Sequence, residues 1–253
     1  MKTWREITRV LGELRRLPRV TVTMSGGPEG ALLYREFRKR HPRYRIIRNR
    51  QWGVELLQLP GSFDDYLRGK EKRELRAKRN RALSLGYSFA VVDPRSRLEE
   101  ILDVNRSLGE RQGRPMHEAY LNRDTVASFF ETRPRIYAVL DREGVLRAYV
   151  HAPVFGEVCS LARLLGHGDH LDNGVMYFAV SEIVRDMIEL KERTGTPMWV
   201  EYGTFFGGGE GLRGFKQRLG LRPYRVAWRW VAESSTEAAD PGLRPSDDVR
   251  ARS

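Results

Sequence analysis

The stretch EVCSLARLLGHGDHLDNGVMYFAV, residues 157–180, carries the strongest fold signal in this sequence. It begins with an apolar run typical of a buried strand and continues, after a turn that contains glycine, into apolar residues at helical spacing. These patterns predict a strand over Glu157–Leu165 and a helix over Gly174–Arg193. Glycines between a strand and a helix let the backbone approach a phosphate, which the free N–H groups at a helix start bind. The stretch therefore predicts an α/β unit with a candidate phosphate site.

The sequence on either side of this unit predicts further strands and helices in an order typical of α/β proteins. On the amino-terminal side we expect a strand over Tyr87–Asp93, a helix over Arg97–Arg111 and a loop over Arg114–Asn122. A second helix over Arg123–Thr132 and two strands over Arg135–Asp141 and Val145–Phe155 should follow. On the carboxy-terminal side we expect a buried strand, a short helix and an alternating strand, over Pro197–Gly203, Leu212–Leu219 and Tyr224–Trp230. Together they predict one mixed sheet over Tyr87–Val231 with helices on both faces. We expect the strands Glu157–Leu165 and Pro197–Gly203 to lie side by side and to splay at their ends.

The residues before this core predict a small extension and a basic helix. In residues 1–62 we expect an α/β extension made of a helix, a strand, a helix and a strand, over Trp4–Leu17, Val20–Met24, Gly30–His41 and Tyr44–Leu59. A long helix over Phe63–Leu85 then joins the core, so that residues 63–231 form one unit. Residues 232–253, rich in Ser, Ala, Asp and Pro, predict a disordered tail.

Composition and charge exclude several classes of protein. The chain has a formal net charge of +12, and residues 232–253 are net acidic, so the rest is more basic still. A body this basic favours a polyanionic partner, such as nucleic acid or the phosphates of a nucleotide cofactor. The lone Cys159 excludes a disulfide framework. We find neither a signal peptide nor an apolar run long enough for a membrane span, and we therefore expect a cytoplasmic location.

The order β-α-α-β-β-β-α-β-α-β over Tyr87–Val231 resembles the core of the GNAT acyltransferases. In that family the strand that corresponds to Glu157–Leu165 ends in an Arg/Gln-x-x-Gly-x-Gly loop, which meets the pyrophosphate of coenzyme A. The resemblance therefore implies that an acyl-CoA is the cosubstrate and that it is held by Arg163, Leu164, Leu165, Gly166, His167 and Gly168, together with Asn173 and Gly174 at the helix start. Here Asp169–Asn173 intervene before the helix. Either the loop is longer than usual, or the turn His170–Gly174 faces the phosphate, or the glycines serve a connection without a ligand.

The carboxy-terminal sequence resembles one branch of that superfamily, the Fem-type transferases. The residues that carry this likeness are Glu201-Tyr202-Gly203 and the run Gly211-Leu212-Arg213-Gly214-Phe215-Lys216-Gln217-Arg218-Leu219-Gly220. The branch includes peptidyltransferases that take amino acids from aminoacyl-tRNA, which implies tRNA as an alternative donor. Members that use tRNA generally carry two cores, and this chain has room for one. The likeness also implies that Lys216 holds a phosphate or polarises the donor carbonyl, and the alternative is a solvated lysine.

Direct acyl transfer needs a base for the amine and an acid for the leaving group. Glu201 is the candidate base, because a carboxylate on a buried strand is costly unless it is paired or used. The alternative is an ion pair with Arg213, Arg163 or Lys216. Tyr202 is the candidate acid, although it faces the other side of the strand unless a bulge intervenes.

Basic residues concentrate on the helix predicted over Phe63–Leu85. At 100° per residue, four cations form a stripe beside the apolar face, namely Arg68, Lys72, Arg76 and Arg79. We interpret the stripe as a polyanion-binding surface, and the alternative is an ordinary solvated face.

Three functions stay open at this point. The first is N-acyl transfer from an acyl-CoA to a small-molecule or peptide amine. The second is aminoacyl transfer from a charged tRNA, and the third is a non-enzymatic nucleic-acid-binding module. We expect no metal, because the close cluster His167, Asp169, His170 and Asp172 has no distant partner residue to complete a site.

Overall fold

The computed structural model of the protein describes residues 16–40, 48–111, 113–205 and 209–232. The helix predicted over Trp4–Leu17 and the disordered tail predicted over residues 232–253 lie outside these ranges, apart from residues 16, 17 and 232.

The described strands form two main sheets and a small hairpin. The larger sheet has the order β1-β12-β2-β11-β9-β8, with the bounds β1 Arg19–Met24, β2 Trp52–Gln58, β8 Val154–Phe155, β9 Val158–Ser160, β11 Trp199–Thr204 and β12 Arg222–Trp230. The smaller sheet has the order β10-β7-β6-β3, with the bounds β3 Ser88–Val92, β6 Ile136–Leu140, β7 Leu146–His151 and β10 Arg163–Gly166. The hairpin pairs β4 Glu110–Arg111 with β5 Arg114–Pro115.

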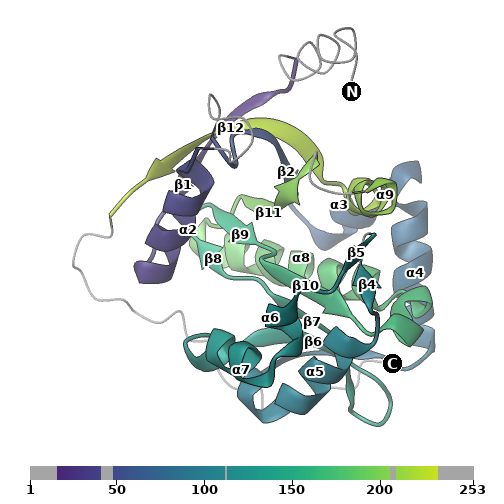
Figure 1. Ribbon diagram of the computed structural model, residues 1–253. Helices are drawn as coiled ribbons and strands as arrows, with labels where there is room; N and C mark the ends of the chain where they lie inside the picture. Colours follow the sequence, from purple (N-terminus) through teal and green to yellow (C-terminus); the bar gives the residue numbers. More distant parts are fainter. Residues whose placement is uncertain (1–15, 41–47, 112, 206–208, 233–253) are drawn as a thin grey trace, which may run out of the picture.

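Helices cover both faces of this pair of sheets, which confirms the mixed α/β class. The α-helices are α2 Pro28–Arg38, α3 Phe63–Leu67, α4 Arg73–Ser84, α5 Leu98–Arg106, α6 Glu118–Leu121, α7 Arg123–Glu131, α8 Val175–Thr194 and α9 Glu210–Leu219. Short 3₁₀ turns are η1 Lys70–Lys72, η2 Pro94–Arg97 and η3 Gly168–Asn173. Apolar side chains of α8 and α4 share a core with both sheets, α5 and α7 pack on the other face of the smaller sheet, and α2 packs on the larger one. In Figure 1, β9, β10 and β11 lie between the group α5, α6 and α7 and the group α2, β1 and β12.

The expectation of a single sheet over Tyr87–Val231 is wrong, because the predicted strand Glu157–Leu165 changes sheets. Its first half, β9, pairs in parallel with β11. Its second half, β10, pairs with β7 in the antiparallel sense. The exchange takes place at Ala162, whose N–H donates to the carbonyl of His151 at 3.0 Å. Apart from Ser160 and Arg163, the residues from Val158 to Leu165 are apolar, so the pattern of hydrophobicity does not identify the new partner strand.

The amino-terminal segment belongs to the larger sheet. Strand β2 lies between β12 and β11, and β1 runs parallel to β12 at the edge. The segment predicted as an extension thus supplies the strand that flanks β11, the strand that carries Glu201.

The helix predicted over Phe63–Leu85 is broken. Helix α3 begins after Ser62, whose hydroxyl accepts the N–H of Asp65, and it ends before Gly69. Gly69 has a φ of +102°, a conformation that glycine adopts far more readily than other residues. Helix α4 starts again at Arg73, so Arg68 does not share a helical face with the cations that follow it.

Candidate active site

The candidate site lies where β9 and β11 stop pairing. The last contact between them is the N–H of Leu161, which donates to the carbonyl of Glu201 at 2.8 Å. Beyond it, β11 continues beside β2, whereas β10 turns away to become the edge strand of the smaller sheet. An edge strand has backbone N–H and C=O groups on the side that no strand covers. The splay predicted for these two strands is therefore present, and it arises from the change of sheets.

Glu201 is at the point where the strands part. Its side chain is 3% exposed, and its Oε1 lies 3.8 Å from the guanidinium of Arg50. The hydroxyl of Ser160 donates to Oε2 at 2.7 Å, and the N–H of Gly203 donates to Oε1 at 2.7 Å. These donors replace the water that a buried carboxylate would lose. The ion-pair partner is Arg50, which was not among the partners expected from the sequence.

A second buried carboxylate, Glu55 on β2, was missed from the sequence. It is fully buried, and the ammonium of Lys216 lies 2.5 Å from its Oε2. Neither oxygen of Glu55 accepts a well-directed hydrogen bond from the described residues. Burial raises the pKa of Glu55, while Lys216 acts in the opposite direction. The signal was available, because Glu55 is a lone acid within the apolar run GVELL, as Glu201 is within its own strand.

Lys216 is buried and neutralised rather than solvated. Only 3% of the residue is exposed, and its ammonium also lies 3.3 Å from the carbonyl of Thr204. It stands 4.8 Å from the ring centre of Tyr202. With Glu55 beside it, Lys216 does not offer an unbalanced charge for a phosphate.

Tyr202 follows Glu201 directly and faces the opposite side of β11. Val200 and Tyr202 pack towards the core under α8, which leaves Glu201 on the far face. The register against β2 shifts between Glu201 and Thr204, so a bulge does intervene, and it includes Tyr202 and Gly203. Burial raises the pKa of the Tyr202 phenol, which keeps the hydroxyl protonated at neutral pH.

The glycines of the predicted phosphate loop face protein atoms. A Cβ on Gly166 would lie 2.5 Å from Sδ of Met176, and one on Gly168 would lie 2.9 Å from Cδ2 of Leu108. The N–H of Gly168 already donates to the hydroxyl of Ser107, at 2.9 Å. The missing side chains of these glycines thus make room for packing, and a larger residue at either position would disturb that packing as well as any phosphate contact.

The start of α8 is covered by α4. Gly174 has a φ of +85°, and a Cβ there would overlap the carbonyl oxygen of Lys78. Just before the helix, Asn173 donates to the hydroxyl of Tyr87 at 3.0 Å and accepts from Arg81 at 3.4 Å. The imidazole of His167 accepts the N–H of Asp169. The residues from His167 to Gly174 therefore form a compact turn held by side chains of the core and of the basic helix.

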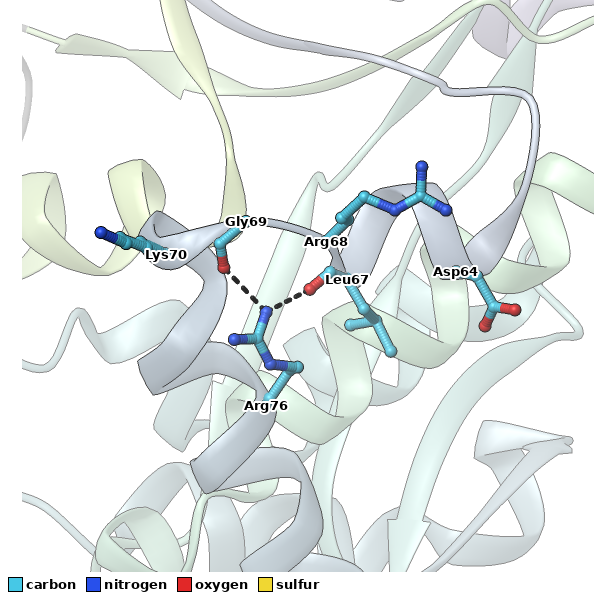
Figure 2. Close-up of a pocket in the computed structure, with 6 residues that line it drawn as sticks. All are labelled: Asp64, Leu67, Arg68, Gly69, Lys70 and Arg76. Carbon is cyan, nitrogen blue, oxygen red and sulfur yellow. Dashed lines mark hydrogen bonds between the residues drawn. The ribbon is translucent and has the colours of Figure 1, made fainter.

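The predicted basic stripe is not a solvated surface. The guanidinium of Arg76 donates to the carbonyls of Leu67 and Gly69, and Figure 2 shows it turned towards both. Arg79 pairs with Glu182 at 2.8 Å, and Lys72 is buried, donating to the carbonyl of Leu219 at 2.7 Å.

Of the four stripe residues, only Arg68 is largely exposed, and it pairs with Asp65. It lines a shallow hollow of about 530 Å³ with Asp64, Leu67, Gly69, Lys70 and Arg76. The assignment of the whole stripe to polyanion binding therefore lacks the free surface that it requires.

The described residues were also searched for a metal site and for a membrane-spanning helix. In those residues no cluster of three or more His, Cys, Asp or Glu side chains is arranged to hold a metal ion, and His170 instead contacts the hydroxyl of Tyr87 at 2.5 Å. Within the same ranges, no helix has the length and apolar character needed to cross a membrane.

Comparison with known proteins gives matches among solved structures. No protein-family model and no curated protein matches the chain. The crystal structure of FemX superposes with a TM-score of 0.50 at 12% identity, over 69% of this chain and 60% of FemX. Over that part of the chain, this protein therefore has a fold similar to that of FemX.

Two further structures cover a similar part of the chain. L-PGS from Bacillus licheniformis matches with a TM-score of 0.44 at 17% identity, over 68% of this chain and 58% of that one. A tandem GNAT protein from the clavulanic acid biosynthesis pathway matches with a TM-score of 0.43 at 13% identity, over 68% of this chain and 50% of that one. The chain thus spans between half and three fifths of the length of these structures.

Proposed function

We propose that this protein transfers an acyl group directly from an activated donor to an amine, at the gap where β10 and β11 part. The observation that carries the proposal is the carboxylate of Glu201, which is buried at that point between the hydroxyl of Ser160 and the N–H of Gly203. A carboxylate held by fixed donors next to an open strand edge is suited to remove a proton from an amine. Its neighbours then hold it in one orientation through the reaction.

Candidate groups for the remaining steps lie on β10 and β11. The amine would lose its proton to Glu201, directly or through the hydroxyl of Ser160, and would then attack the donor carbonyl. Backbone N–H groups on the uncovered edge of β10, near Leu164, would stabilise the oxygen that becomes negative. Tyr202, which lies on the opposite face of β11 from Glu201, would supply the proton for the leaving group, and burial keeps its phenol protonated.

An acyl-CoA is the first donor that we propose. The uncovered edge of β10 suits the amide-bearing arm of coenzyme A, since strand edges bind amides through their backbone groups. The phosphates would then lie near the turn that contains His167 and Asn173. Because Gly166 and Gly168 are packed against side chains, contacts to the phosphates would come from outward-facing atoms of this turn.

Aminoacyl-tRNA is the second donor, and the position of the basic segment favours it. Helix α4 lies across the start of α8, with the backbone of Lys78 against Gly174. The exposed cations of this segment include Lys70, Arg73 and Arg81, and Arg81 lies at the crossing, where it donates to Asn173. A polyanion bound there would be held next to the end of β10, close to the gap.

The test compares Glu201→Gln with Glu55→Gln in an assay that supplies radiolabelled acetyl-CoA or mixed aminoacyl-tRNA, with free amino acids and short peptides as acceptors. We expect Glu201→Gln to lower the rate of transfer in a single turnover by about 10²–10⁴-fold, the usual contribution of a general base, with little change in donor binding. Circular dichroism checks that both variants are folded. The donor that supports transfer by the parent protein identifies the donor class.

Two outcomes would change the proposal. If Glu55→Gln abolishes transfer and Glu201→Gln does not, the base is Glu55, and Glu201 serves as a structural carboxylate. If neither donor yields acylated product with the folded parent protein, direct acyl transfer is not its activity.

A further inference from the structure

Arg163, the first residue of β10, is a buried cation without an acidic partner. The residue is 9% exposed, and its Nη1 atom is buried with no hydrogen-bond acceptor among the described residues. Within the described ranges no carboxylate lies within 4.0 Å of its guanidinium, although Arg133 nearby pairs with Glu29 at 2.8 Å. A buried charge costs several kcal/mol unless a partner offsets it, so an uncompensated guanidinium needs an explanation.

Aromatic rings surround this guanidinium. Its central carbon lies 3.6 Å from the ring centre of Phe129, 4.4 Å from Tyr120 and 5.7 Å from Phe130. Such rings stabilise a cation through their faces and keep water away, but they accept no hydrogen bond from its edge. The N–H fork of Arg163 is thus fixed in position and left without an acceptor.

The same guanidinium lies on the face of the sheets that carries Glu201. Leu161 and Leu164 both pack into the core under α8, so the alternation of side chains resets at Ala162. Ser160 and Arg163 therefore point to the face away from α8, the face to which Glu201 also points. The hydroxyl of Ser160 contacts the proposed base, and two residues separate Ser160 from Arg163 along the strand, on one continuous surface.

The local charges favour a single negative charge in the ligand. Glu29 neutralises Arg133, and its Oε1 lies 3.5 Å from Nε2 of His151, which makes no hydrogen bond with the described residues. Burial, together with Arg133 and Arg163, lowers the pKa of His151, which leaves the imidazole neutral at pH 7. Among Arg133, His151 and Arg163, the uncompensated positive charge is therefore that of Arg163.

We propose that Arg163 anchors a carboxylate of the acceptor, so that the acceptor is an amine that also carries a carboxylate, such as a free amino acid or a peptide. This inference rests on the proposed acyl transfer and specifies its substrate class. A carboxylate is planar, bears one charge and matches the two parallel N–H groups of a guanidinium. It would bind the edge of the guanidinium, which the rings of Phe129 and Tyr120 leave without an acceptor, and the amine of the same molecule would then extend towards Glu201.

The experiment measures binding alone and needs no donor. L-alanine, L-alaninamide and inorganic phosphate are titrated into ¹⁵N-labelled protein, and the Nε–H signals of arginine side chains are followed. The Arg163 signal is the one absent from the Arg163→Lys spectrum. Arg163→Met removes the charge, Arg163→Lys keeps the charge without the fork, and Arg123→Met serves as a control on α7, where the cation is exposed and paired with Glu99.

We expect L-alanine to shift the Arg163 signal. We also expect it to bind at least about tenfold more tightly than L-alaninamide, because one charge-assisted hydrogen bond between the carboxylate and the guanidinium contributes about that factor. Arg163→Met should weaken L-alanine binding by a similar factor, Arg163→Lys by less, and Arg123→Met hardly at all. Because the side chain of Arg163 makes no hydrogen bond or ion pair with the described residues, the unfolding temperature of Arg163→Met should stay within about 4 °C of the parent.

Equal binding of L-alanine and L-alaninamide, or an unmoved Arg163 signal in the parent protein, would overturn the anchor. Tighter binding of phosphate than of L-alanine would overturn the carboxylate class. These results are separate from those of the transfer assay. Amino-acid binding without transfer contradicts only the proposed function, and transfer to acceptors that lack a carboxylate contradicts only the anchor.

Discussion

The basic segment α3–α4 and the cation at the start of β10 differ in how their charges are satisfied. In the segment, Arg76 caps two carbonyls, Arg79 pairs with Glu182, and Lys72 donates to the carbonyl of Leu219. The side chain of Arg163 has neither a hydrogen bond nor an ion pair among the described residues. The segment stood out in the sequence because it is dense in charge, and Arg163 stood out only as the first letter of a motif.

This difference shows which kind of cation indicates a ligand. Charges that cluster in a sequence are often used to fasten one element to another, here α4 to α8 and α9. A cation that is buried, fixed by its surroundings and left unpaired is the stronger sign of a binding site, because the fold alone gives it nothing to bind. Three measurements on the basic segment test whether its charges are structural.

The largest effect is expected from Arg79→Leu, which would leave Glu182 on the buried face of α8 with only Arg185 as its partner among the described residues. Breaking a buried pair costs about 3–5 kcal/mol, and the remaining Arg185 puts the loss at the lower end of that range. Urea unfolding measures the loss. Arg68→Leu is the matched control, because its pair with Asp65 is exposed and is worth less than about 1 kcal/mol. Equal losses in both variants would show that Arg79 is no more structural than a surface residue.

Lys72 should give a pH dependence of nearly the same size. Burial, with a smaller contribution from Arg222, lowers the pKa of Lys72 from 10.5 to about 8. Between those values the unfolded chain binds more protons than the folded protein, so stability rises with pH. Relative to Lys72→Met, the parent should gain up to about 3 kcal/mol in free energy of unfolding as the pH rises through this interval. Urea titrations across this range measure the difference. A difference that does not change with pH would mean that Lys72 is not desolvated.

The smallest effect on stability is expected from Lys70→Gln with Arg73→Gln, since both side chains face outward. Lys72 and Arg76 are unsuitable for a test of tRNA binding, because both bond to backbone carbonyls and changing them would damage the fold. If tRNA is the donor, the slope of log affinity against log salt should flatten by about 0.7–0.9 for each phosphate that is no longer neutralised. The unfolding free energy should move by less than about 0.5 kcal/mol. If the salt dependence of affinity, measured by fluorescence anisotropy, is unchanged in the double variant, these two cations do not contact tRNA.

Glu201 and Glu55 show how much of the candidate site could be predicted from the sequence. Both are lone acids inside apolar strands, and the rule that selected Glu201 applies equally to Glu55. The rule could not give their partners. Arg50 lies near Glu201 and Lys216 near Glu55 only because β2 enters the sheet between β12 and β11, a neighbour relation that spans most of the chain.

Local sequence was enough to predict the α/β class, most of the longer helices and strands, and the strand of Glu201 and Tyr202, because periodicity and turn residues depend on neighbouring positions. Three further features emerged only from the folded molecule. The chain changes sheets at Ala162, side chains of other residues pack against Gly166 and Gly168, and most cations of the basic stripe are bonded within the protein. Each of them depends on which other segment supplies the partner for a backbone edge, a gap or a charge. Such pairings are settled by packing and by the satisfaction of buried groups across the whole molecule, and several of the partners are far away in the sequence, as Leu108 is from Gly168 and Glu182 is from Arg79.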